Sequence, residues 1–200
     1  MKRVLLAGEG KTELGEWAKE REHRDNPGEM GVLEALLRRI GAHVTFVEGV
    51  MWKSIVKYRA GAHRSPETRN VLGVVNRAID LRCDAVVFSR DRDGSAERER
   101  DIEEGLQGAA EVFPQVALVG GVAVENIEGW LLLLLGNVDG ERVSSKQTKA
   151  ELETRFRVVS LRQKVEAVGD ARIESVPEGS LSRFVHRART VLSPAVDGSP

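Results

Sequence analysis

The stretch "VVFSRDRDGS", residues 86–95, combines an apolar run with a charged end. A short apolar run bounded by turn residues is typical of a strand that is buried on both faces. Asp91 and Asp93 follow the run one residue apart, and a Gly-Ser step comes directly after them. In an open parallel sheet, ligands bind beyond the carboxyl ends of the strands. The stretch therefore predicts a parallel α/β sheet with a polar site at one edge.

Strand and helix patterns alternate along residues 1–140. The expected strands are "VLLAG" at 4–8, "HVTFVEGV" at 43–50, "DAVVFSRD" at 84–91 and "QVALVGGVAV" at 115–124. The expected helices are "MGVLEALLRRIGA" at 30–42, "SPETRNVLGVVNRAIDLRC" at 65–83, "SAERERDIEEGLQGAAEVF" at 95–113 and "ENIEGWLLLLLG" at 125–136. This alternation predicts an α/β fold with a Rossmann-like, mostly parallel sheet flanked by helices.

Two of these helices carry clear boundary signals. Ser65 is a preferred N-cap residue, and Pro66 suits the first helical position. Gly41 suits the left-handed position that follows the end of a helix. We therefore expect one helix to begin at Ser65 and another to end just before Gly41.

The pattern changes after Gly140. Residues 141–192 contain helical patterns with no strand between them, so we expect a short helical C-terminal extension to an α/β domain at 1–140. The three helical segments are "KQTKAELETRF", "SLRQKVEAVG" and "EGSLSRFVHRARTVL". The tail at 193–200, "SPAVDGSP", is expected to be disordered.

Composition excludes several classes of protein. The net charge of −1 gives no overall attraction to nucleic acid, so a polyanion would have to bind at a local basic patch. With Cys83 as the only cysteine, neither an intramolecular disulfide nor a cysteine-based zinc site can form. "LLLLL" at 131–135 is too short to cross a bilayer, and the apolar start is too short for a signal peptide. We expect a cytoplasmic protein with no membrane partner.

Three acidic pairs fall at the carboxyl ends of expected strands. They are Glu9 and Glu13, Asp91 and Asp93, and Glu125 and Glu128. If the strands are neighbours, the six carboxylates face one crevice and repel one another. A divalent cation removes this conflict, and oxygen-only ligands favour Mg²⁺ or Mn²⁺.

Each pair also has a purely structural interpretation. Asp-Gly is a common turn, so Asp93 and Gly94 suit the end of any strand. Glu9 and Glu13 suit a solvated loop. Glu125 and Glu128 stand near a helix N-terminus, where carboxylates favour the helix dipole. The metal hypothesis depends on the three pairs occurring together.

The chain resembles Toprim domains, the catalytic module shared by topoisomerases, bacterial primases and OLD-type nucleases. In "VLLAGEGKTE", Glu9, Gly10 and Glu13 match a strand that ends in Glu-Gly and is followed by an acid. "VVFSRDRDG" is similar to the second Toprim motif, Asp-x-Asp-Gly after a strand. "VENIEGWLLL" resembles a segment of bacterial Toprim-like proteins of poorly known function. The resemblance covers about residues 1–135.

The resemblance implies a Toprim-type fold, bound Mg²⁺ or Mn²⁺, and phosphodiester chemistry on DNA or RNA. Asp91 and Asp93 would ligate the metal, and Glu9 would ligate it or act as general base. Glu13 and Glu128 are candidates for a second ion, and Glu125 competes with Glu128 for that role. The OLD resemblance further suggests phage defence or nucleic-acid processing and a separate ATPase subunit, because "GEGKTE" lacks a complete phosphate-binding loop. A homo-oligomer is left open.

Two alternatives compete with a nuclease. The stretch at 86–95 is also similar to the first motif of haloacid-dehalogenase-type phosphatases, with Asp91 as nucleophile and Asp93 as general acid. That motif normally opens its domain, whereas here about ninety residues precede it. The other alternative is a metal-binding, non-catalytic subunit of a larger complex.

A basic segment at 52–69 is the candidate nucleic-acid contact. Trp52 and Tyr58 interleave with the cations and are able in principle to stack on bases. Its basic residues are Lys53, Lys57, Arg59, Arg64 and Arg69, with His63 among them. Lys11, beside Glu9, is a further candidate for pairing with phosphate. The structural alternative for the segment is a solvated surface loop, in which case the C-terminal cations Arg183, Arg187 and Arg189 are the next candidates.

Overall fold

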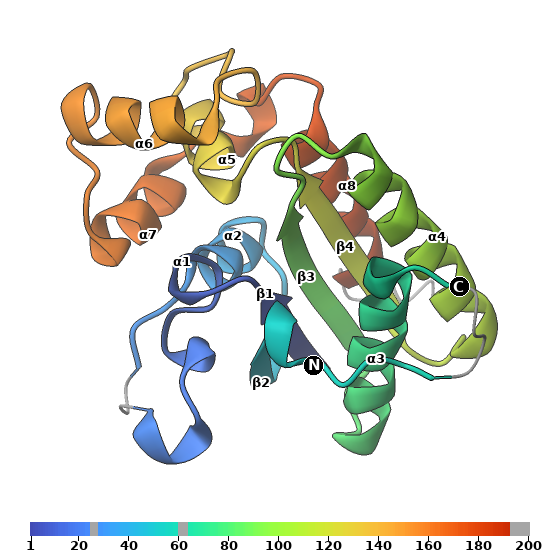
Figure 1. Cartoon of the computed structure of the whole chain (residues 1–200). Coiled ribbons are helices and arrows are strands. Elements are labelled where there is room, and N and C mark those ends of the chain that lie inside the picture. The colour runs from blue at the N-terminus through green and yellow to red at the C-terminus, as the bar shows by residue number, and fades with distance from the viewer. Residues whose placement is uncertain (25–27, 60–63, 193–200) are drawn as a thin grey trace, which may run out of the picture.

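The protein is represented by a computed structural model that describes residues 1–24, 28–59 and 64–192. Four parallel strands form one sheet in the order β2-β1-β3-β4 (Figure 1). The strands are β1 (Lys2–Gly8), β2 (Val44–Met51), β3 (Ala85–Asp91) and β4 (Ala117–Ala123). The prediction of an α/β fold with a parallel sheet is therefore confirmed. The predicted tail at 193–200 lies outside the described residues.

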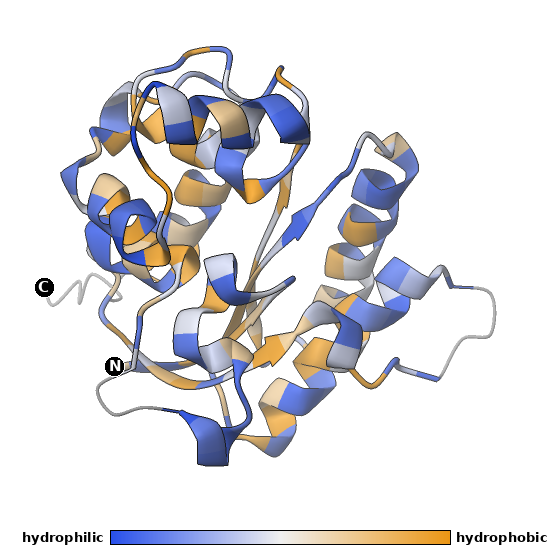
Figure 2. Ribbon diagram, turned by 60° about the vertical axis from the view of Figure 1, so that its left-hand side comes forward, coloured by the Kyte–Doolittle hydropathy of each residue, from blue (hydrophilic) through white to orange (hydrophobic). Residues whose placement is uncertain are grey.

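Helices cover both faces of the sheet. One face carries α3 (Pro66–Asp80) and α4 (Ala96–Val112). The opposite face carries α1 (Lys11–Leu14), α2 (Val32–Arg39), α5 (Ile127–Leu134) and α8 (Ser180–Leu192). Figure 2 shows the apolar sides of the helices turned inward. Four short 3₁₀ helices lie in the described connections between these elements: η1 (Gly15–Ala18), η2 (Arg21–His23), η3 (Trp52–Ser54) and η4 (Ile173–Ser175).

The central strands are apolar on both faces because both faces are buried. Leu6 and Val87 belong to the core beneath α2 and α5, whereas Leu5 and Phe88 belong to the core beneath α3 and α4. All four side chains are fully buried. Burying a side chain of this size contributes about 1.5–3 kcal/mol relative to leaving it exposed. The uninterrupted apolar runs are thus the signature of a sheet enclosed between two helix layers.

The predicted helix boundaries are confirmed at both signals. The Ser65 hydroxyl accepts a hydrogen bond from the Thr68 N–H at 3.1 Å, and α3 begins at Pro66. After α2, the N–H of Gly41 donates to the Arg38 carbonyl while the N–H of Ala42 donates to the Leu37 carbonyl. Gly41 has φ +79°, the left-handed conformation that glycine adopts without strain.

The C-terminal segment folds as three helices, α6 (Ser145–Thr154), α7 (Leu161–Asp170) and α8. Helix α8 packs against β4 and shares the core of the sheet, where Phe184 lies 5.1 Å from Trp130 between ring centroids. A Cβ atom on Gly121 would lie 2.6 Å from Phe184, so the glycine allows α8 to approach the strand. In the described part of the chain, no helix is long and apolar enough to cross a membrane.

Candidate functional site

The strand order places the three acidic pairs side by side. Strand β3 lies between β1 and β4, so the carboxyl ends of these three strands are adjacent. The N–H of Asp91 donates to Glu9 Oε1 at 3.0 Å, and the N–H of Ile127 donates to Asp91 Oδ1 at 3.0 Å. The N–H of Asp93 donates to the main-chain carbonyl of Glu125 at 3.4 Å. The loops after three strands are therefore joined at one edge of the sheet.

Asp91 is the most perturbed acid of this edge. Burial raises its pKa to about 7, and the negative charges of Glu13, Glu128 and Asp93 act in the same direction. The hydrogen bond from Ile127 opposes the shift without cancelling it. In the described part of the chain Asp91 makes no ion pair, so no side-chain cation offsets the repulsion directly.

Glu13 lies beneath this edge, on the α2 and α5 side of the sheet. Its Oε2 accepts a hydrogen bond from the Gly10 N–H at 3.0 Å, which fixes the first turn of α1. A Cβ atom on Gly8 would come within 2.7 Å of the Glu13 Cβ, so only glycine leaves room for this carboxylate. Burial raises the pKa of Glu13, and the charge of Glu128 raises it further.

Glu128 stands in the first turn of α5, and its carboxylate is 10% exposed. Asn126 begins this helix by accepting a hydrogen bond from the Gly129 N–H at 3.1 Å, so Glu125 precedes the helix instead of belonging to it. Lys164 of α7 reaches Glu128 Oε1 at 2.8 Å. Sequence reasoning did not include Lys164, because the lysine lies 36 residues further along the chain in a segment with no recognised motif.

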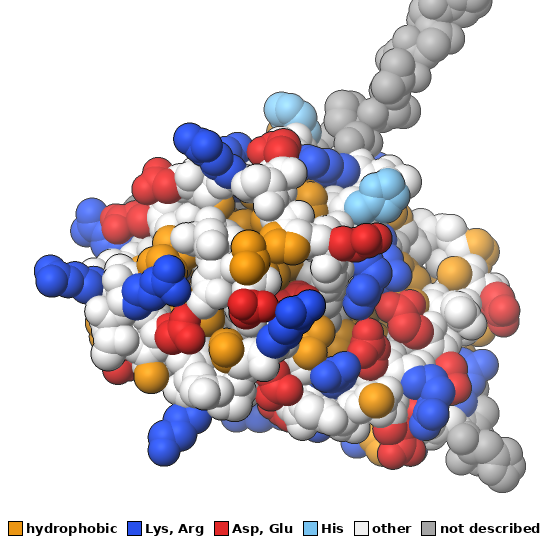
Figure 3. All heavy atoms as spheres, turned by 90° about the horizontal axis from the view of Figure 1, so that it is seen from above, with side chains coloured by type: hydrophobic (Ala, Val, Ile, Leu, Met, Phe, Trp, Pro, Cys, Tyr) orange, Lys and Arg blue, Asp and Glu red, His pale blue; other side chains and the backbone are white. Residues whose placement is uncertain are grey.

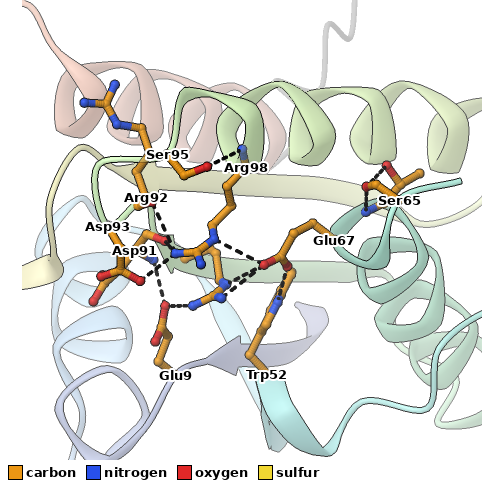
Figure 4. A network of polar contacts seen from close by, with 11 residues as sticks. Glu9, Trp52, Ser65, Glu67, Asp91, Arg92, Asp93, Ser95 and Arg98 are labelled. Carbon is orange, nitrogen blue, oxygen red and sulfur yellow. Dashed lines mark hydrogen bonds and ion pairs between the residues drawn. The ribbon is translucent and has the colours of Figure 1, made fainter.

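An arginine network borders the opposite side of the acids (Figure 4). Arg90 pairs with Glu9 and also with Glu67 Oε1 at 3.0 Å. Glu67 additionally accepts a hydrogen bond from Trp52 Nε1 at 2.6 Å. Burial, with the nearby charge of Arg98, lowers the pKa of Arg90. Arg90 was not among the residues predicted from the sequence. Its position in a buried strand directly before Asp91 could have indicated it, because a cation in such a place needs acidic partners.

Arg98 holds the turn that carries the two aspartates. Its guanidinium donates to the main-chain carbonyls of Asp91 and Arg92 at 2.9 and 3.2 Å, and to Asp93 Oδ2 at 2.5 Å. It also lies 3.3 Å from Glu67 Oε1. Asp93 has φ +50°, a strained conformation for a residue with a side chain. Arg98 therefore fixes a turn that the backbone alone would not favour.

The acids share an edge but do not converge on one point in this arrangement. Among residues 1–24, 28–59 and 64–192, the one group of three candidate ligands within 4.8 Å is Glu20, Glu22 and His23. All three residues are exposed; Glu20 directly precedes η2, and Glu22 and His23 lie in it. At the edge itself, Glu9 forms an ion pair with Arg90, and Asp93 forms an ion pair with Arg98.

The basic segment is more dispersed than its sequence suggests. Trp52 is buried, with its ring centroid 5.1 Å from that of Phe88. Tyr58 packs edge-to-face on Phe113 at 5.7 Å. Both aromatic side chains thus contact the core, and the segment presents charge to the solvent more than it presents aromatic faces.

The predicted basic residues have several different surroundings. Lys53, Lys57 and Arg59 are exposed. Arg64 lies against Gly108 of α4, and Arg69 donates to the Tyr58 carbonyl at 2.9 Å. His63 falls outside the described residues. Lys11 pairs with Glu29 at 2.9 Å on the surface.

The C-terminal cations already have partners. Arg183 lies 3.4 Å from Glu99, Arg187 donates to the Gly120 carbonyl at 2.8 Å, and Arg189 pairs with Glu174 at 2.9 Å. The view from above the sheet in Figure 3 shows acidic and basic side chains interspersed. This face of the molecule therefore has mixed charge.

No model of a known protein family, no characterised protein and no solved structure matches this chain. The resemblance of the short motifs after β1 and β3 to Toprim domains therefore stays a prediction from the sequence.

Proposed function

We propose that this chain is a metal-dependent nuclease of Toprim-like type that hydrolyses phosphodiester bonds in nucleic acid. One observation carries the proposal: Asp91 is a partly buried carboxylate, with no ion pair among the described residues, at the ligand-binding edge of a parallel sheet and among further acids. Perturbed acids of this kind occur preferentially at functional sites.

The residues present fit a hard divalent ion in charge and in donor chemistry. Asp91, Asp93 and Glu9 offer carboxylate oxygens, which Mg²⁺ and Mn²⁺ prefer. Glu9 and Asp93 are 31% and 53% exposed, and binding the ion would require their side chains to turn away from the arginines toward the solvent side of the edge. Once bound, the ion would polarise the phosphodiester, activate a water molecule and neutralise the leaving oxygen.

The chain's own residues would supply orientation. Arg98 keeps Asp91 and Asp93 in a fixed turn through its contacts with two main-chain carbonyls. The N–H of Ile127 holds one oxygen of Asp91 at a set position. Such preorganisation is a requirement for a catalytic site, because a ligand displaced by about 1 Å costs about a hundredfold in rate.

A nuclease assay on single-stranded DNA, duplex DNA and RNA with Mg²⁺ or Mn²⁺ tests the proposal. We expect cleavage by the wild type and a loss of more than about a hundredfold in Asp91→Asn, because losing even a residue that only orients a metal ligand costs 10–100-fold. Asp84→Asn is the matched control, since Asp84 stands at the opposite end of the same strand and pairs there with the Arg3 N–H at 2.7 Å.

Two results would contradict the proposal. Near-normal cleavage by Asp91→Asn would remove the proposed site. Phosphatase activity with a phosphoaspartate trapped on Asp91 would favour the haloacid-dehalogenase alternative instead.

A further inference from the structure

Lys164 is a cation placed among the acids at the carboxyl ends of β1, β3 and β4. We call this part of the sheet the acidic edge; it carries Glu9, Glu13, Asp91, Asp93, Glu125 and Glu128. Lys164 Nζ lies 2.8 Å from Glu128 Oε1 and 3.3 Å from the hydroxyl of Thr12, the residue before Glu13. The lysine side chain is 14% exposed and that of Glu128 is 10% exposed. A buried pair of this kind is held firmly, because separating it would leave an unpaired charge away from water.

Helix α7, which carries Lys164, is held in place by contacts at both ends and by a buried side chain. At its start, the Gln163 N–H donates to the Ser160 hydroxyl at 3.2 Å. At its end, Arg39 of α2 donates to the Ala171 carbonyl at 2.8 Å. Val168 is fully buried in the core that α2 and α5 share. The lysine therefore reaches the acids from a rigid helix.

The charges on this side of the edge are partly compensated, because one lysine faces two carboxylates. Glu13 and Glu128 repel each other, and Lys164 attracts both. On the other side, Asp91 has no ion pair among the described residues. A divalent ion bound through Glu13 and Glu128 would have to displace the nearly buried lysine or lie against a like charge. An ion bound through Asp91 would displace no cation from that carboxylate, and the arginines nearby hold Glu9 and Asp93, whose side chains are more exposed.

We infer that Lys164 takes the place of a second metal ion beside Glu13 and Glu128, so that the edge holds a single divalent ion at Asp91. This inference rests on the proposed function, since it concerns the same site. It changes the role expected for Glu13 and Glu128, which become partners of a built-in cation instead of metal ligands. Helix α7 of the C-terminal extension thereby becomes part of the site.

The test is the number of Mn²⁺ ions bound by the full-length chain, measured by titration calorimetry and by electron paramagnetic resonance. Every protein carries Glu20→Gln, Glu22→Gln and His23→Gln, so that the exposed group in η2 does not contribute. We expect one ion in this background. Lys164→Met should bind two, and Lys164→Met with Glu128→Gln should again bind one. Arg162→Met is the matched control, because Arg162 is an exposed cation on the same helix whose one ion pair within the described residues is with Glu166 at 2.9 Å.

The outcomes separate the two proposals. Two ions in the Lys164-containing protein, one of them lost in Glu128→Gln, would overturn the inference and leave the proposed function standing. A single ion in a folded Lys164→Met protein would also overturn it. Absence of any ion that depends on Asp91 would instead overturn the proposed function, and the inference with it. If Lys164→Met fails to fold, Glu128→Gln in the Lys164-containing protein still tests the inference: the single ion should remain, and its loss would show that Glu128 is a metal ligand.

Discussion

The acidic edge and the basic segment at 52–69 differ in how the fold treats their sequences. The acids are spread over more than a hundred residues, yet the order β2-β1-β3-β4 brings them to one edge. The basic residues are almost contiguous, yet the fold turns them in several directions, with Trp52 buried and Arg69 bonded to the Tyr58 carbonyl. The order of the strands, and not closeness in the sequence, therefore determines which of these charged residues become neighbours.

The largest expected contrast between the two regions is in stability. Glu67→Ala should lower the free energy of unfolding by about 3 kcal/mol, because it removes the acceptor of the buried Trp52 Nε1 and one of the two acidic partners of Arg90. Arg90, the partner left behind, is 14% exposed. Lys57→Ala, in the exposed part of the basic segment, should change the free energy by less than about 0.5 kcal/mol. Urea unfolding measures both.

Equal free energies of unfolding in Glu67→Ala and Lys57→Ala would contradict the contrast between the two regions. They would mean that the arginine network bordering the acids is no more integral to the fold than the surface cations are. A loss confined to Glu67→Ala would support the contrast, since Glu67 lies within residues 52–69, near the start of α3, and yet belongs to the arginine network.

A smaller contrast is expected in the response to pH, measured in EDTA. The pKa of Asp91 is raised to about 7 in the folded protein, against about 3.9 in an unfolded chain. Between these values the folded state keeps a proton that the unfolded state has lost, so the free energy of unfolding falls as pH rises. Asp91→Asn removes this loss. The variant should therefore gain at least about 1 kcal/mol over the wild type at about pH 8, and much less at about pH 5.

Lys57→Gln serves as the control for the pH experiment, because the exposed lysine should alter stability little at either pH. If the stability of Asp91→Asn relative to wild type is the same at both pH values, the fold does not raise the pKa of Asp91. The acidic edge would then resemble the solvated basic segment in its electrostatics.

Most of the sheet was predictable from the sequence because its signals are local. Apolar runs, Ser65 with Pro66, and Gly41 each determine structure within a few residues, and the strand ends of "LLAGEG" and "VVFSRDRDG" follow from them. Asp91 and Glu9 could be placed together because strand ends at one edge of a sheet are neighbours. The Toprim-type subclass and the nuclease activity stay predictions.

The partners of the acids were not predictable for a physical reason. Arg98 and Lys164 reach the edge through long side chains from helices, and such contacts leave no period or motif in the sequence. Trp52 illustrates the reverse case, since an isolated tryptophan among cations looks the same whether it is exposed or packed on Phe88. The contribution of Lys53, Lys57 and Arg59 to nucleic-acid binding also stays a prediction.

The most direct measurement of the central claim is the shift in melting temperature that Mn²⁺ causes, at about pH 8, in the wild type and in Asp91→Asn. A ligand that binds only the folded state at about 100 times its Kd stabilises it by about 2.7 kcal/mol, which corresponds to roughly 5–10 °C for a chain of this size. With Glu20→Gln, Glu22→Gln and His23→Gln present in every protein, we predict a shift of that order in the parent and in Asp84→Asn, and none in Asp91→Asn. A shift of equal size in Asp91→Asn would contradict a metal site at the carboxyl edge of the sheet.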